Sequence, residues 1–99
     1  MKTPRTIPNL HYVAVPLSPV FSRAGHATVF YRHDKDGVPC LYDVRTHYGD
    51  DGRKTRAAAL RCGRAIVTRQ QPMGLRNTYC CARWRARVRA AVPGICLEV

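Results

Sequence analysis

The clearest pattern of hydrophobic and polar positions lies in residues 26–48. The runs "HATVFYRH" and "VPCLYDVRTHY" are rich in β-branched and aromatic residues and lie on either side of "DKDG". The Asp36–Gly37 pair supplies the left-handed backbone conformations of a tight hairpin turn. The pattern therefore predicts two antiparallel strands, 26–33 and 38–48. Strict alternation in the second strand places on one face Val38, Cys40, Tyr42, Val44 and Thr46, and on the other Leu41, Asp43, Arg45 and His47.

A helix is predicted for residues 54–70, "KTRAAALRCGRAIVTRQ". Thr55 or Asp51 can cap its start, and Pro72 ends it. At 100° per residue, the face that packs on the sheet consists of Ala59, Leu60, Gly63, Ile66 and Val67. Gly63 on this face allows a close approach to the sheet. The opposite face presents to solvent the basic residues Lys54, Arg61, Arg64 and Arg69.

The stretch "YCCARWRARVRAAV", residues 79–92, fits two periods. Read as a strand over 79–90, it turns Trp84 and Val88 inward and sets four arginines in one outward row, about 6.6–6.8 Å apart. Read as a helix, it forms an apolar stripe of Cys81, Trp84, Val88 and Ala91, and its alanines and arginines are good helix formers. We favour the strand, because "VPGI" at 92–95 is typical of a turn into a last strand at 95–98.

The remaining segments complete a fold prediction. Prolines interrupt residues 1–25, which we expect to be irregular apart from a short strand at 10–15, and the flanking prolines favour an edge position for it. Residues 70–78 read as a loop. Residues 1–99 are expected to form a single domain of the α+β class, with an antiparallel sheet of four to five strands and one amphipathic helix packed on one face.

Charge changes this picture more than any motif does. The net charge is +11, from 17 Lys and Arg against 6 Asp and Glu. Residues 1–52 contain six basic and five acidic residues, whereas residues 53–89 contain eleven basic residues and no acidic one. Such asymmetry indicates an anionic partner. No apolar run approaches the roughly 20 residues of a membrane helix, so we expect a cytoplasmic protein without a membrane partner.

Catalytic and metal-binding chemistry is poorly supported. The five cysteines include no C-x-x-C and are expected to be buried thiols. The acidic pairs Asp34/Asp36 and Asp50/Asp51 lie in predicted turns, where aspartate serves the backbone. His26, His33, Cys40 and His47 recur every seven residues, but on alternating faces, which argues against one zinc site. We therefore expect no enzyme activity, metal or cofactor, and keep a thiol- or zinc-dependent enzyme as a remote alternative.

In general character, the hairpin-plus-helix unit at 26–70, in a chain under a hundred residues without catalytic apparatus, resembles small phage-encoded inhibitors of bacterial defence nucleoproteins, such as anti-CRISPR proteins. The resemblance implies a stoichiometric binder in a bacterial host cell. Such a binder would block a surface of the effector complex or its nucleic-acid groove. The resemblance assigns no functional role to any particular residue of this chain.

Two functional hypotheses follow. The first is a non-enzymatic inhibitor whose Arg-rich face contacts an acidic protein surface or a nucleoprotein complex. The second is a general DNA- or RNA-binding domain that relies on phosphate contacts. The planar guanidinium group of arginine can form two hydrogen bonds to one phosphate. Both assign the partner surface to the same residues, namely Arg83, Arg85, Arg87 and Arg89 with Lys54, Arg61, Arg64 and Arg69. Neither predicts an oligomeric state.

Overall fold

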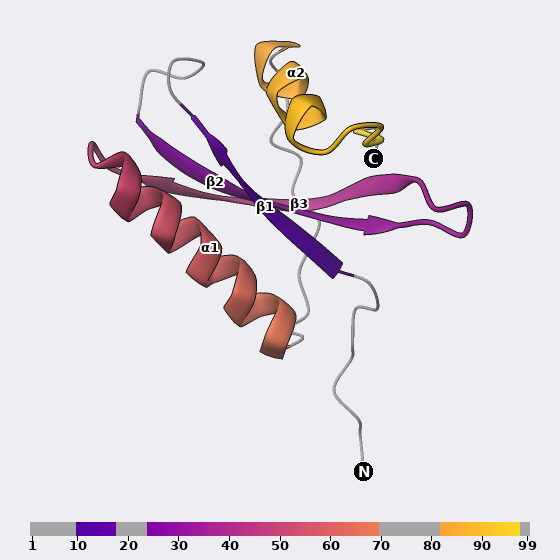
Figure 1. Ribbon diagram of the computed structural model, residues 1–99, viewed down its shortest axis with the longest axis horizontal. Coiled ribbons are helices and arrows are strands. Elements are labelled where there is room, and N and C mark those ends of the chain that lie inside the picture. Colours follow the sequence, from indigo (N-terminus) through magenta and orange to yellow (C-terminus); the bar gives the residue numbers. More distant parts are fainter. Residues whose placement is uncertain (1–9, 18–23, 70–81, 98–99) are drawn as a thin grey trace.

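A three-stranded antiparallel sheet lies between two helices in a computed structural model that describes residues 10–17, 24–69 and 82–97. In chain order the elements are β1 (Leu10–Pro16), β2 (Gly25–His33), β3 (Pro39–Tyr48), α1 (Gly52–Arg69) and α2 (Ala82–Ala91). The strand order is β1-β2-β3, so β1 occupies the predicted edge position. The two helices lie on opposite sides of the sheet (Figure 1). The α+β class is confirmed.

The second half of the chain differs from the prediction. The described residues form three strands rather than four or five, and a second helix. The strand predicted at 79–90 is wrong over 82–90, which belongs to α2; residues 79–81 lie outside the described ranges, as does the loop predicted at 70–78. The strand predicted at 95–98 is reduced to a single parallel bridge between Cys96 and Cys40.

Helix propensity explains the outcome for α2. Eight of its ten residues are alanine or arginine, which are among the best helix formers. Within α2 only Trp84 and Val88 are buried, and they lie four residues apart on one face. A strand would also turn Ala82, Ala86 and Ala90 inward, on the same side as Trp84 and Val88, but in α2 these three alanines are exposed.

The sheet has a hydrophobic cluster on each face. Beneath α1, Leu10 and Phe30 pack with Ile66. On the other face, Trp84 and Val88 of α2 join strand residues and the segment after α2; this larger cluster contains Val15, Leu17, Ala27, Val29, Leu41, Val44, Trp84, Val88, Val92, Ile95 and Leu97. Because both faces are covered, the sheet is the middle of three layers.

The predicted hairpin is confirmed, but its second strand does not alternate strictly. Tyr31 pairs with Leu41 and Phe30 with Asp43, so Tyr42 is an extra residue and forms a β-bulge. The prediction that Tyr42 and Val44 share a face is therefore wrong. Tyr42 packs beneath α1, whereas Val44 lies on the α2 side together with Leu41.

The paired aspartates hold turns, as predicted. The Asp34 carboxylate accepts hydrogen bonds from the backbone N–H groups of Asp36 and Val38, and Gly37 has a φ of 81°. The Asp51 carboxylate accepts from the N–H groups of Arg53 and Lys54 and so caps α1.

Gly63 lies where α1 comes closest to β1. Ala59, Gly63 and Ile66 are buried on the predicted packing face of the helix, with Leu60 and Val67 half-buried. A Cβ atom added at Gly63 would overlap the ring of Tyr12. The close contact between helix and strand requires glycine here, although a residue with higher helix propensity would otherwise stabilise α1.

Gly63→Ala should lower the free energy of unfolding by about 1–3 kcal/mol, since overpacking against the Tyr12 ring outweighs the gain in helix propensity. Urea unfolding measures the change. In a Tyr12→Ala background the same substitution should become neutral or stabilising. An increase in stability from Gly63→Ala alone would contradict the close contact.

Candidate nucleic-acid interface

One basic surface of the described residues is built on α2, and the burial of Trp84 and Val88 orients it. Trp84 is 2% exposed and Val88 is fully buried, so the line joining them faces the sheet. Arg83 and Arg87 lie on one flank of this line and Arg85 and Arg89 on the other, as 100° steps require. Arg83, Arg85 and Arg89 are exposed and Arg87 is half-buried.

The predicted single row of four arginines is therefore replaced by two pairs with spacing i,i+4. Between the pairs, the outward side of the helix carries the small exposed residues Ala82 and Ala86. Each pair brings like charges together, which destabilises an isolated helix by about 0.2–0.5 kcal/mol. No acidic residue lies within α2 to offset them, so an anion bound along either flank would relieve the repulsion.

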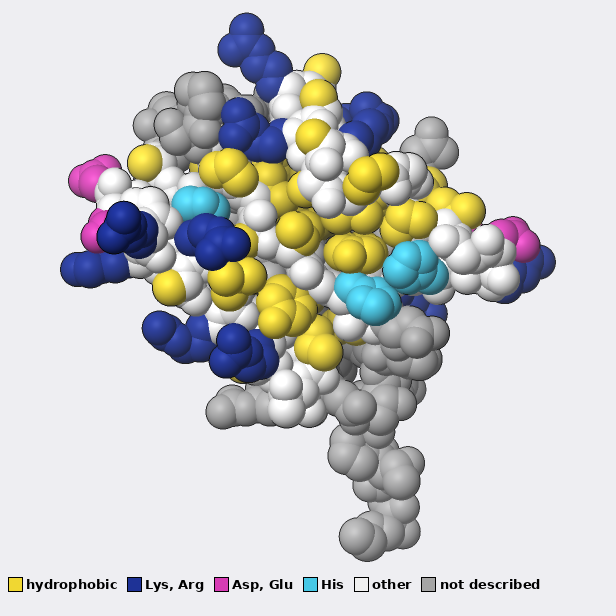
Figure 2. All heavy atoms as spheres, viewed as in Figure 1, with side chains coloured by type: hydrophobic (Ala, Val, Ile, Leu, Met, Phe, Trp, Pro, Cys, Tyr) yellow, Lys and Arg dark blue, Asp and Glu magenta, His cyan; other side chains and the backbone are white. Residues whose placement is uncertain are grey.

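The second set of predicted site residues lies elsewhere. Lys54, Arg61 and Arg64 are exposed on α1, on the far side of the sheet from α2, and Arg69 is the last residue of that helix. Figure 2 shows basic side chains over both helices, with a band of hydrophobic side chains between them. The eight residues therefore do not form one surface. They divide into an α2 surface and an α1 surface.

Sequence reasoning missed an aromatic group on the α2 side of the sheet. The ring of His11 stacks on Tyr31, its cross-strand partner, with centroids 5.4 Å apart. The ring of His33 meets both rings edge-on, at 5.0 Å from His11 and 5.9 Å from Tyr31. His11 and His33 are exposed and Tyr31 is half-buried, so this group is a platform of three rings of which two are exposed. The register in which β1 pairs with β2 brings the three rings together, and the sequence does not specify this register.

The other two histidines fasten α1 to the sheet. Thr28 is fully buried, and its hydroxyl donates to the Ala59 carbonyl of α1 at 2.7 Å. The hydroxyl proton is thereby used, so His47 Nε2, 3.1 Å away, is the donor to Thr28 Oγ1. A second contact joins β2 to α1: His26 Nδ1 lies 2.9 Å from the hydroxyl of Thr55, near the start of the helix.

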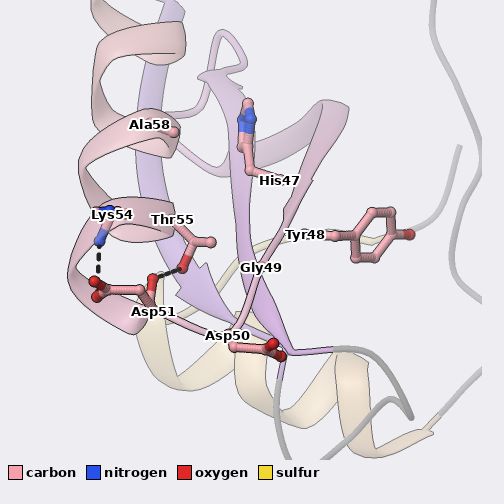
Figure 3. A pocket seen from close by; sticks show the side chains of 8 residues that line it. All are labelled: His47, Tyr48, Gly49, Asp50, Asp51, Lys54, Thr55 and Ala58. Carbon is pink, nitrogen blue, oxygen red and sulfur yellow. Dashed lines mark hydrogen bonds between the residues drawn. The ribbon is translucent and has the colours of Figure 1, made fainter.

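An open hollow of about 350 Å³ lies beside this network, between the end of β3 and the start of α1. Its lining is His47, Tyr48, Gly49, Asp50, Asp51, Lys54, Thr55 and Ala58. In Figure 3 Tyr48 points away from α1, while Asp51, Lys54 and Thr55 gather at its first turn. The Thr55 hydroxyl lies within 3.3 Å of the carbonyl oxygens of Asp51 and Gly52. This hydroxyl is therefore engaged in holding the start of the helix.

Burial lowers the pKa of both of these histidines and so favours their neutral forms. Desolvation lowers the pKa of His47, and desolvation with a smaller contribution from Arg56 lowers the pKa of His26. A neutral imidazole has one N–H donor and one acceptor nitrogen, so it can form a hydrogen bond with a hydroxyl group. The arrangement therefore stabilises the packing of α1 rather than forming a proton-transfer site.

Potential metal ligands are dispersed over the described residues. No group of three or more His, Cys, Asp or Glu residues there lies close enough to hold a metal ion. Cys40, Cys62 and Cys96 are not joined in disulfides, and all three are half-buried rather than buried as expected. Neither described helix has the length and apolar composition to cross a membrane.

Comparison with protein-family models, curated proteins and solved structures finds no match to this chain. The resemblance to anti-CRISPR-type inhibitors therefore stays a prediction.

The free energy of unfolding should fall as the pH drops below about 6.5, the ordinary histidine pKa. His26 and His47 have lowered pKa values in the folded state, so below that pH the unfolded chain binds protons that the folded chain does not. Urea unfolding at about pH 7.5 and 5.5 measures the loss.

His26→Asn with His47→Gln keeps hydrogen-bonding atoms near Nδ1 and Nε2 but cannot titrate, so this variant should lose much of the pH dependence. His11→Gln with His33→Gln, at two exposed histidines, should keep it. A pH dependence that follows the second pair instead of the first would contradict the assignment.

Proposed function

We propose that the protein is a non-enzymatic binder of nucleic acid and that α2 is its binding element. The observation that supports this most is the division of the four arginines into two pairs on either flank of one anchored helix. A ten-residue helix is about 15 Å long, and with side chains it is about 10–12 Å wide. The major groove of B-DNA is about 12 Å wide and accepts a helix.

The α2 surface suits contact with two phosphate backbones at once. With Ala82 and Ala86 on its outward side, the helix can approach the floor of a groove closely. Arg83 and Arg87 would then reach one strand, and Arg85 and Arg89 the other. Such contacts give affinity without reading sequence, because phosphates carry no base information. The proposed activity is therefore duplex binding with little sequence preference and a steep dependence on salt.

A single-stranded nucleic acid is the second candidate ligand, favoured by the platform of His11, Tyr31 and His33. Aromatic rings stack on bases regardless of sequence, and the platform lies on the same side of the sheet as α2. A single strand bound more tightly than a duplex at equal salt would favour this candidate. An inhibitor of a defence nucleoprotein, as the resemblance implies, could use the same α2 surface.

Replacing Arg85 and Arg89 with glutamine should weaken duplex binding at least about tenfold at low salt, because two phosphate contacts are lost. The slope of log K against log salt should become shallower by roughly two units. Fluorescence anisotropy with labelled duplex DNA, single-stranded DNA and RNA at about 50 and 200 mM salt measures both effects.

The matched control is Arg61→Gln with Arg64→Gln on α1, which removes the same charge from the far side of the sheet. It should leave most of the affinity intact. Equal losses from both variants would show a response to net charge alone and contradict the assignment to α2. No binding to any nucleic acid at low salt would overturn the proposed function and direct attention to an acidic protein partner.

A further inference from the structure

We propose that Cys40 and Cys96 form a reversible disulfide that fastens the segment after α2 to the edge of β3. The two residues face each other across an isolated parallel bridge. The bridge is held by two backbone hydrogen bonds, from the N–H of Cys96 to the carbonyl of Pro39 at 2.7 Å and from the N–H of Leu41 to the carbonyl of Cys96 at 2.9 Å. These bonds flank Cys40 and fix Cys96 directly beside it.

The backbone spacing suits the bond. Neighbouring strands lie about 4.7–4.9 Å apart, which is within the roughly 4.4–6.8 Å that separates the Cα atoms of a disulfide. Ile95 and Leu97 turn into the α2-side cluster, so Cys96 points to the opposite side of its segment. There the Cys96 side chain lies close enough to the Cys40 thiol to contribute to raising the pKa of that thiol. Both side chains are half-buried and so open to a small oxidant.

The proposed chemistry is exchange with a low-molecular-weight disulfide such as glutathione disulfide. One protein thiolate attacks a glutathione sulfur and releases one glutathione thiolate, leaving a mixed disulfide. The second protein thiolate then attacks the protein sulfur of that mixed disulfide and releases the second glutathione. Two protein thiols are oxidised, one glutathione disulfide is reduced to two glutathiones, and two protons pass to solvent or to the leaving thiolates.

The disulfide would act on α2 through the hydrophobic core. Ile95 and Leu97, on either side of Cys96, are buried in the same cluster as Trp84 and Val88. The backbone also continues directly from α2 into this segment, where the N–H of Ile95 donates to the carbonyl of Val92 at 3.2 Å. Fastening Cys96 to β3 would therefore restrict the movement of α2 away from the sheet. This inference stands independently of whether α2 binds nucleic acid.

The test begins with the wild-type chain in a glutathione redox buffer, without denaturant. Peptide mapping without reduction should find Cys40 linked to Cys96 in a monomer, with a mass lower by about 2 Da. Burial, with a smaller contribution from the Asp34 carboxylate, raises the pKa of the Cys40 thiol, so the link should form faster as pH rises. Oxidation should raise the Tm by at least about 5 °C.

A second variant separates this pair from the other cysteines. Cys62→Ser, Cys80→Ser and Cys81→Ser together leave only Cys40 and Cys96, and this variant should still form the link and gain Tm. Its matched control adds Cys96→Ser and should gain none. A link that forms only in urea, or one that joins Cys40 or Cys96 to a different cysteine in the wild-type chain, would overturn the proposal.

Discussion

The burial of Trp84 against the sheet is the interaction on which the rest of this structure depends. Three strands make a sheet too small to close on itself, and both of its faces carry hydrophobic residues. α1 covers one face, and the other would expose Val15, Val29 and Val44 if α2 were absent. Trp84 is the largest fully buried side chain of the described residues and fills this space. Its position also fixes the rotation of α2 about its own axis and therefore the directions in which the arginines of α2 point.

Much of the fold could be predicted from residue patterns whose meaning is local. The Asp-Gly turn, the two β-rich runs beside it, the edge position of β1 and the packing face of α1 each follow from a few neighbouring residues. The sequence also indicated the close approach at Gly63, although its partner, Tyr12, is distant in the chain. The strand was favoured over the helix for residues 79–90 although both interpretations fit, because arginine alternates with Trp84 and Val88 in a way that satisfies both periods. Helix propensity decides between the two interpretations.

Other features depend on the register of the strands, which the sequence does not specify. The bulge at Tyr42 shifts the rest of β3 by one residue, and this shift places His47 opposite His26 on the α1 side. Without it, His47 would face the other side of the sheet and could not bond to Thr28. The platform of His11, Tyr31 and His33 likewise requires the pairing of β1 with β2. The partition of basic residues into an α1 and an α2 surface depends on the two helices covering opposite faces of the sheet.

The proposed function requires that the α2 surface, rather than the α1 surface, contacts the polyanion. An NMR titration of the ¹⁵N-labelled chain with short duplex DNA at low salt distinguishes the two surfaces, because it reports on the backbone amides of both helices in one experiment. We expect shift changes concentrated in residues 82–91, with little change in residues 53–64. Changes concentrated in α1, or spread evenly over both helices, would contradict it.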